Sequence, residues 1–181
     1  MQIAQANLAA MAGEGFSPGL EQIFLEHKEL VFRAAYRVTG NATDAEDVLQ
    51  TVFLRLARLE KFPEITNLPG YLHRSAVNAS LDLLRGRKDS QTLSLDEDSN
   101  QAEAAATDHG PRSAELRDWL RHALARLNPR WAEMFVLRFI EDKSNREIAA
   151  IMKTSPAVVA VVLHRTRSLL KKDFQQTRQS R

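Results

Sequence analysis

The feature that most constrains the fold is an apolar repeat every three or four residues, which recurs along most of the chain. It is clearest at residues 43–59, where Thr43 and Glu46 have the spacing of a capping box and the apolar positions that follow share one helix face. These positions are Ala45, Val48, Leu49, Val52, Phe53, Leu56 and Leu59. The sequence therefore predicts an all-α protein of amphipathic helices.

Two more helices are expected beside this one. A Ser-Pro pair opens a helical apolar pattern at residues 17–40, as an N-cap followed by proline in the first turn would do. A proline-punctuated loop is expected at residues 62–69, followed by a third helix to about residue 87. Residues 17–88 are thus expected to form a three-helix domain, and residues 1–16 a mobile tail.

A second helical domain is expected after an acidic linker. Residues 89–112 are rich in Ser, Asp, Glu and Ala, so they bury too little apolar surface to offset the entropy of ordering, and a flexible linker is predicted. Four helices are expected in residues 113–175, and a short tail at residues 176–181. Within this domain residues 158–163 have the composition of a strand, but a Ser-Pro pair precedes them as a helix start and we assign them to a helix.

Composition excludes several classes of protein. The chain has no cysteine, and its five histidines lack the spacing of a ligand set, so neither a disulfide nor a metal site is expected. No phosphate-binding glycine loop or paired acid and base is evident, so the sequence predicts no cofactor and no enzyme activity. The first basic residue is Lys28, and no apolar run approaches ~18 residues, which favours a cytoplasmic protein without membrane insertion.

Charge is unevenly distributed, although the net charge is only +2. Residues 119–181 hold 13 Lys or Arg against 5 Asp or Glu, which makes this part a candidate nucleic-acid surface. It contains a short amphipathic helix, a turn near Lys153 and Thr154, and a capped basic helix. This pattern is typical of a helix-turn-helix, but a helical hairpin with a solvated basic end has the same pattern.

Three stretches of sequence carry a family resemblance: DAEDVLQTVFLRL at 44–56, GYLHRSAVNASLDLLRGRK at 70–88, and LNPRWAEMFVLRFIEDKSNREIAAIM with LHRTR at 127–167. They resemble regions two and four of bacterial sigma factors of the sigma-70 family, in the small extracytoplasmic-function (ECF) subfamily. The resemblance implies that region two binds the clamp helices of the polymerase β′ subunit and helps open the minus-ten element. Region four would dock on the β flap and recognise the minus-thirty-five element. The implied partners are core RNA polymerase, promoter DNA and an anti-sigma factor.

The helix at residues 43–59 has a candidate docking face opposite its apolar stripe. At about 100° per residue this face holds a leucine among polar residues, which suits a partner helix, and the resemblance places the β′ contact here. An ordinary solvated face with one stray leucine would look the same. The predicted core-binding residues are Asp44, Asp47, Gln50, Leu54 and Arg58.

The third helix has a candidate face for single-stranded DNA opposite its own apolar side. An aromatic ring can stack on an unpaired base, an amide can recognise its edge and arginines can hold phosphates. By resemblance, this face serves promoter melting, and the loop at residues 62–68 holds the flipped base; a solvated basic face is the alternative. The predicted minus-ten residues are Tyr71, Arg74, Asn78, Arg85, Arg87 and Lys88.

The predicted recognition helix is apolar where relatives often carry hydrogen-bonding residues. Its inward stripe is expected to be Val159, Leu163, Thr166 and Leu170. Outward methyl groups can pack on thymine methyls and basic residues can hold phosphates, although Val161 and Val162 would equally suit contact with the β flap or an anti-sigma factor. The predicted minus-thirty-five residues are Ser155, Ala157, Ala160, Val161, His164, Arg165, Arg167 and Lys171.

Two other functions remain open on the sequence. A helix-turn-helix repressor would explain residues 119–181 but leaves the first domain without a role, and it would usually dimerise on a palindrome. A sigma mimic that only sequesters an anti-sigma factor would explain the apolar recognition helix. The predicted function is a sigma factor, monomeric when free, that recruits core polymerase to promoters and aids DNA opening without catalysis.

Overall fold

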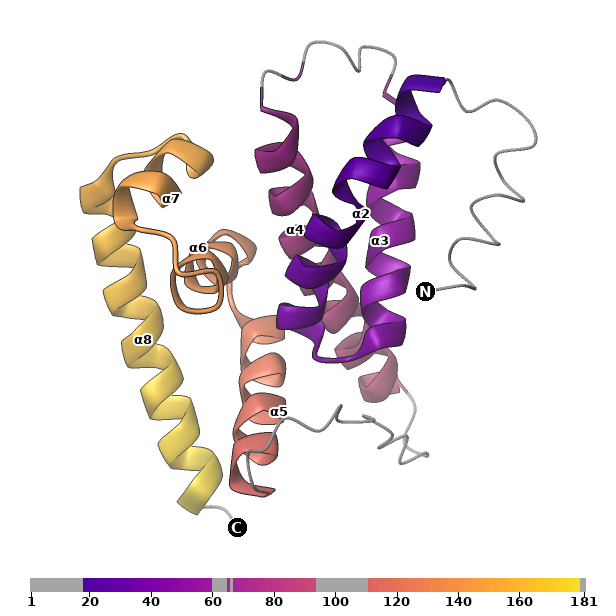
Figure 1. Ribbon diagram of the computed structural model, residues 1–181. Coiled ribbons are helices and arrows are strands. Elements are labelled where there is room, and N and C mark those ends of the chain that lie inside the picture. The colour runs from indigo at the N-terminus through magenta and orange to yellow at the C-terminus, as the bar shows by residue number, and fades with distance from the viewer. Residues whose placement is uncertain (1–17, 60–64, 66, 94–110, 180–181) are drawn as a thin grey trace. The chain divides into compact units, whose positions relative to one another are not determined.

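The computed structural model describes residues 18–59, 65, 67–93 and 111–179, which form helices joined by turns, without a strand (Figure 1). In chain order the helices are α2 (Pro18–Thr39), α3 (Ala42–Ala57), α4 (Leu68–Leu93), α5 (Pro111–Arg126), α6 (Pro129–Phe139), α7 (Asn145–Met152) and α8 (Pro156–Gln179). The predicted all-α fold, with three helices followed by four, is confirmed for this part of the chain. The predicted tail at residues 1–16 and most of the predicted linker lie outside the described residues.

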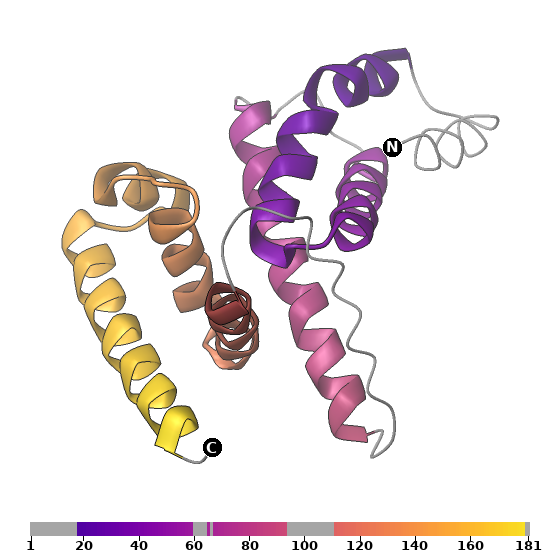
Figure 2. The ribbon, with the colours of Figure 1, turned by 60° about the horizontal axis from the view of Figure 1, so that its bottom comes forward.

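The chain separates into two compact units, and the division falls between Ser80 and Leu81, inside α4. In the first unit α2 and α3 lie side by side, as Figure 2 shows. Gly40 ends α2, as the sequence predicts: its φ of 68° is left-handed, and its N–H donates to the carbonyl of Tyr36 at 2.7 Å. A glycine adopts this conformation without steric cost, so the chain can turn directly into α3.

The first turn of α3 differs from the prediction. The helix begins at Ala42, and the side chain of Asn41 caps it by accepting a hydrogen bond from the backbone N–H of Asp44 at 3.2 Å. The predicted capping box of Thr43 and Glu46 is therefore wrong, because both residues already lie inside the helix. Asn is as strong an N-cap as Asp or Ser, so the helix starts at the earlier signal.

The core of the first unit is built from the predicted stripe of α3. All its members are buried except Leu59, which lies beyond the helix end and is 41% exposed. The ring of Phe53 is fully buried and meets the ring of Phe24 from α2 edge to face, with centroids 4.9 Å apart. This aromatic contact joins the N-terminal part of α2 to the C-terminal part of α3 and adds to the burial of apolar area.

α4 is longer than predicted at both ends. At its start the side chain of Asn67 accepts from the N–H of Gly70 at 3.0 Å, and a Cβ on Gly70 would lie 2.7 Å from that amide, so this cap depends on the glycine. At its end residues 89–93 are helical, although they belong to the predicted linker. No proline or glycine interrupts residues 87–93, so nothing in the sequence stops the helix where the apolar pattern fades.

The boundaries of the second helical region also differ from the prediction. α5 begins at Pro111, two residues before the predicted start, with proline in the first turn, where its missing N–H costs nothing. α8 continues to Gln179, so the predicted tail at residues 176–181 is helical up to residue 179. Both extensions are short and leave the order of the helices as predicted.

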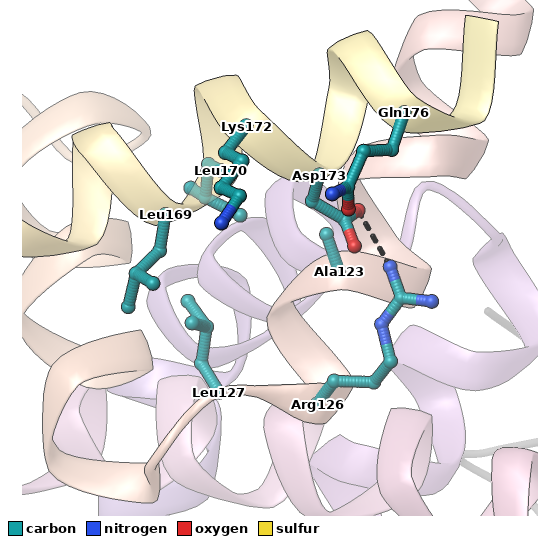
Figure 3. Close-up of a pocket in the computed structure, with 8 residues that line it drawn as sticks. All are labelled: Ala123, Arg126, Leu127, Leu169, Leu170, Lys172, Asp173 and Gln176. Carbon is teal, nitrogen blue, oxygen red and sulfur yellow. Dashed lines mark hydrogen bonds and ion pairs between the residues drawn. The ribbon is translucent and has the colours of Figure 1, made fainter. Parts of the chain in front are cut away.

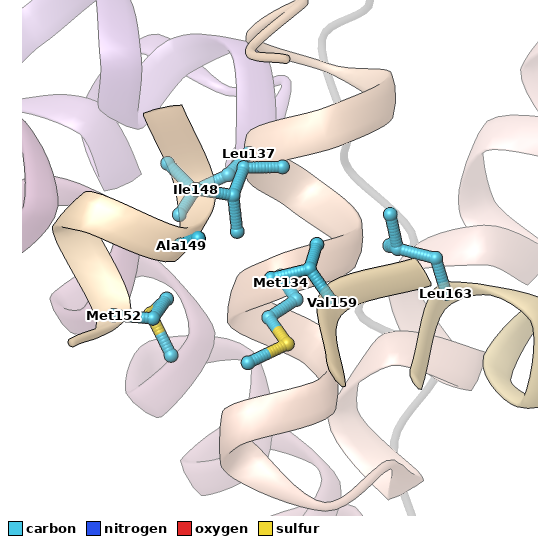
Figure 4. Packing of buried hydrophobic residues seen from close by; sticks show 7 residues of the cluster. All are labelled: Met134, Leu137, Ile148, Ala149, Met152, Val159 and Leu163. Carbon is cyan, nitrogen blue, oxygen red and sulfur yellow. The ribbon is translucent and has the colours of Figure 1, made fainter. Parts of the chain in front are cut away.

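In the second unit α6, α7 and α8 share one apolar cluster. Figure 4 shows its seven members converging from the three helices: Met134, Leu137, Ile148, Ala149, Met152, Val159 and Leu163. The strand-like residues 158–163 are helical, as predicted, because their buried members recur at helical spacing and join this cluster. The cluster fixes α7 against α8.

A hydrogen bond, an ion pair and an aromatic contact, together called the clasp, join α5 to the C-terminal half of α8. The carboxylate of Asp173 accepts from the indole N–H of Trp119 at 3.0 Å. It also pairs with the guanidinium of Arg126 at 2.6 Å, as Figure 3 shows. Trp119 also meets the ring of Phe174 edge to face, with centroids 4.8 Å apart. Beside this clasp, α5 and α8 border a pocket of about 300 Å³.

Replacing Phe53 by Ala should destabilise the first unit by about 3–5 kcal/mol, because the ring is fully buried. Thermal unfolding followed by circular dichroism measures the loss. Both tryptophans, Trp119 and Trp131, belong to the second unit, so their fluorescence transition should be unchanged. The matched control is Leu25→Ala, at a leucine that is 53% exposed, where a cost within about 0.5 kcal/mol is expected. Equal losses in the two variants would contradict this account of the core.

Candidate nucleic-acid interface

α7 and α8 have the geometry of a helix-turn-helix. The two helices are bent by 104° at the turn, within the range of roughly 90–120° that is typical of the motif. Lys153 ends α7 in the left-handed conformation, with φ 50°, and the N–H of Thr154 donates to the carbonyl of Ala149 at 2.9 Å. A lysine in this conformation costs about 1–2 kcal/mol, which a glycine would avoid. The turn therefore forms where the sequence predicts it, without the usual glycine.

The inward stripe of α8 is as predicted. The buried residues of this helix are Val159, Leu163, Thr166 and Leu170. Because these four residues occupy one side of the helix, the opposite side faces solvent along its whole length. The guanidinium of Arg130 also donates to the carbonyl of Met152 at 3.3 Å, which supports the end of α7 next to the turn.

The structure places all eight predicted minus-thirty-five residues on the exposed side of α8 or at its cap. Ser155 is the cap, and its hydroxyl accepts from the N–H of Val158 at 3.3 Å. Val158 is 47% exposed and lies beside Val161, which is 50% exposed, so it belongs to the same surface although it is absent from the predicted set. The spacing of three residues between two valines is the sequence signal that would have found it.

Basic side chains flank the exposed apolar turns of α8. Arg146 in α7 and Lys153 in the turn are exposed before it. Those that follow in α8 are Arg165, Arg167, Lys171, Lys172 and Arg178, all exposed. The single acidic residue of α8 is Asp173, which is paired with Arg126. The exposed side of this helix-turn-helix is therefore cationic around an apolar centre.

The predicted minus-ten residues are spread along α4. Tyr71 is 36% exposed and Arg87 is exposed, whereas Arg74 and Asn78 are half-buried. Arg74, Asn78 and Arg87 each have a partner within the chain. The guanidinium of Arg85 pairs with the carboxylate of Asp82 one turn earlier, at 3.0 Å. Lys88 lies in the same helix. Tyr71 to Arg85 span ~21 Å along α4 at 1.5 Å per residue.

The predicted core-binding residues separate into two groups. Asp47 and Arg58 are exposed, and Gln50 and Leu54 are half-buried, so these four are accessible on α3. Asp44 differs, because it is 1% exposed and its side chain is turned into the protein. It lies in the first turn of α3, where a carboxylate interacts favourably with the positive end of the helix dipole. The structure therefore assigns Asp44 to the helix start and not to the docking face.

Two family models match the chain. They are sigma-70 region 2, over residues 23–89, and sigma-70 region 4, over residues 117–170. The ECF RNA polymerase sigma factor SigE of Mycolicibacterium smegmatis is 32% identical over 164 residues, which cover 90% of this chain and 64% of that protein. The RNA polymerase sigma factor CarQ of Myxococcus xanthus is 31% identical, over 84% of this chain and 87% of that protein. The chain belongs to the ECF subfamily of sigma-70 factors.

A solved structure has the same fold. The structure of CnrH in complex with the cytosolic domain of CnrY matches 96% of this chain and 98% of that chain, with a TM-score of 0.52 and 22% identity. In this sigma factor region two comprises α2, α3 and most of α4, and region four comprises most of α5 through α8. Within the described residues no group of three or more Cys, His, Asp or Glu could hold a metal. No single described helix is long and apolar enough to span a membrane, and only the bent pair α7 and α8 passes that test jointly.

A capping box begins the helix-turn-helix of region four. The hydroxyl of Ser144 accepts from the N–H of Glu147 at 3.3 Å, and the carboxylate of Glu147 accepts from the N–H of Ser144 at 2.8 Å. These hydrogen bonds, aided by the charge of Lys143, hold the pKa of Glu147 below its ordinary value of 4.5. The ionised carboxylate therefore stabilises the start of α7.

Replacing Glu147 by Gln should make region four less stable at neutral pH, and the difference from the native chain should vanish in acid. Because folding lowers the pKa of Glu147, its ionised carboxylate stabilises region four fully above about pH 4.5. This stabilisation is lost as the pH falls through the folded pKa. Urea unfolding followed by tryptophan fluorescence, from pH 3 to 7, measures the difference in unfolding free energy between the variant and the native chain. In a Ser144→Ala background the same difference should be smaller, since one hydrogen bond is gone. A difference that is constant with pH would contradict this assignment.

Proposed function

We propose that this sigma factor directs core RNA polymerase to a set of promoters by using three separate faces. The exposed face of α3 docks on the β′ clamp helices, the row on α4 engages the minus-ten element, and the exposed side of α8 recognises the minus-thirty-five element. The observation that carries the proposal is the cationic helix-turn-helix of region four, joined in one chain to a region two with accessible faces on two helices. A protein that is only a DNA-binding module would need the helix-turn-helix but not region two.

In region two we assign protein docking to the accessible residues of α3 and DNA contact to residues of α4. Asp47, Gln50, Leu54 and Arg58 combine an apolar side chain with polar neighbours, as the centre and rim of a protein interface do. Tyr71 is the only aromatic residue of α4, and its ring is accessible for stacking on an unpaired base. Asn78 lies two turns further along the helix, where its amide would recognise a base edge, and Arg74, Arg85, Arg87 and Lys88 supply positive charge for phosphates.

In region four the cap and the helix that it begins share the work. The first backbone amides of α8, next to Ser155, can hold a phosphate, because the start of a helix carries partial positive charge. Ala157, Ala160 and Val161 then face the floor of the major groove. His164 and Arg165 follow at its edge, and Arg167 and Lys171 neutralise the phosphate backbone. Residues 17–88 and 113–175 are the functional domains in this scheme.

The remaining features of the proposal follow from the biology of initiation. The protein acts in the cytoplasm as a monomeric, non-catalytic subunit, because core polymerase supplies the chemistry of RNA synthesis and the scaffold that spaces the two domains. The β flap is the expected partner of region four, and an anti-sigma factor is the expected regulator. A helix-turn-helix repressor remains the alternative, and a stable dimer that binds a palindrome without polymerase would favour it.

Transcription from a random promoter library tests the proposal as a whole. Purified core enzyme is incubated with the library, with and without the chain, and transcript ends are sequenced. The expected result is a set of start sites preceded by two sequence elements, present only when the chain is added. Loss of this selectivity in the complete reaction would overturn the proposal.

Replacing Asp47 and Leu54 together by Ala should weaken core association by about tenfold or more, because truncation of residues central to an interface costs over ~1 kcal/mol. Titration of labelled chain with core enzyme measures the dissociation constant. The matched control replaces Leu25 and Glu26, an exposed leucine and acid on α2, by Ala. Equal affinity of the test and control variants would remove α3 from the docking surface.

Replacing Asn78 by Ala should impair promoter opening more than closed-complex binding, because the amide meets a base only after the strands separate. Permanganate reactivity of minus-ten thymines measures opening, and a filter assay at low temperature measures closed complexes. A template that is mismatched at the minus-ten element, and so already open, should reduce the defect. Native permanganate reactivity in the variant, with its fold intact by circular dichroism, would exclude this role.

A further inference from the structure

The first turns of α8 present only apolar side chains to solvent. Ala157, Val158, Ala160 and Val161 are exposed, and the two valines expose about half of their surface, at 47% and 50%. The nearest hydroxyl, on Ser155, already accepts the hydrogen bond that caps the helix. From Pro156 to Val162 no side chain can donate or accept a hydrogen bond. We call these four exposed residues the methyl patch.

The methyl patch lies at the part of a helix-turn-helix that enters the major groove, since the N-terminal residues of the second helix contact the base edges there. Each base pair presents hydrogen-bonding groups in that groove, and among the standard bases only thymine also presents a methyl. A side chain without polar atoms can therefore favour one base directly, and that base is thymine. Opposite any other base the patch would desolvate polar edges without replacing their hydrogen bonds.

We infer that the methyl patch recognises thymine methyl groups in the upstream promoter element. This inference rests on the proposed function and names the base that α8 selects. Ala157 and Val161 are four residues apart, or ~6 Å along the helix at 1.5 Å per residue. That length matches about two base steps of ~3.4 Å. The upstream element should thus contain one or two thymines whose methyl groups contribute to binding.

The charges around the methyl patch favour DNA over a protein as its occupant. Exposed basic residues precede it, at Arg146 and Lys153, and follow it, at Arg165 and Arg167. Phosphates border both sides of the major groove, so an apolar centre with cations at both ends matches a groove with anionic walls. A protein interface would also have an uncharged core, but its rim is typically of mixed polar residues, whereas the charged residues named here are all basic.

Substitution of uracil for thymine tests the inference, because deoxyuridine pairs like thymidine and lacks only the methyl. The probe is a promoter selected from the random library by the holoenzyme of core and chain. Each thymine of its upstream element is replaced in turn, and holoenzyme binding is measured at fixed salt. One or two replacements should weaken binding about fourfold each, as expected for the loss of one buried methyl. Replacements in the spacer between the two elements should have no effect.

Variants of the patch complete the experiment. Val158→Ala with Val161→Ala should bind the native promoter more weakly and should lose most of the sensitivity to uracil, since the partner of the methyl is gone. Leu169→Ala is the matched control, because it removes an exposed apolar side chain of the same helix outside the patch, and it should keep the full sensitivity. Tryptophan fluorescence confirms that region four is folded in each variant.

Failure of the thymine inference and failure of the proposed function give different results. If replacing each upstream thymine by uracil leaves holoenzyme binding unchanged, the inference is overturned while the proposed function stands. If the valine variants then weaken association with core enzyme, the patch contacts a protein instead. A library that yields no preferred upstream element would overturn the proposed function and the inference together.

Discussion

The packing of α6, α7 and α8 around one apolar cluster is the constraint on which region four depends. Val159 and Leu163 of α8 are buried against residues of α6 and α7, and this contact holds the two helices of the motif at 104°. With one side of α8 committed to the core, its other side must face outward. The proposed DNA-contact surface of α8 is therefore oriented by buried residues that are not part of it. Any change that loosened the cluster would alter the direction of the recognition helix.

In region two, too, the buried residues determine which faces of the helices are accessible. The aromatic contact of Phe24 with Phe53 and the buried stripe of α3 fix α2 against α3, which leaves the side of α3 that carries Asp47 and Leu54 accessible. α4 contributes its own buried positions, such as Leu72 and Ala76, and keeps Tyr71 exposed. The residues proposed for protein docking and those proposed for minus-ten DNA contact therefore lie on different helices.

Much of this arrangement could be predicted from the sequence, because helical spacing determines which residues are buried together. The inward stripe of α8 is placed as expected, despite the strand-like composition of residues 158–163, and the eight residues of the predicted minus-thirty-five set are exposed. The helix starts were less predictable. Asn41 and Thr43 are both capping residue types near the start of α3, and only the structure shows that Asn41 is the cap and that Asp44 is buried. The end of α4 was missed because no breaking residue marks it.

In the proposed complex the exposed residues of α4 and those of α8 contact two separate promoter elements at the same time. Photo-crosslinkers placed at Tyr71 and at Val161, in holoenzyme bound to a selected promoter, test it directly. The account predicts crosslinks at two sites more than one helical turn of DNA apart, or over ~34 Å, with the Val161 site upstream. Crosslinks from both positions to a single site, or from Val161 to protein alone, would contradict it.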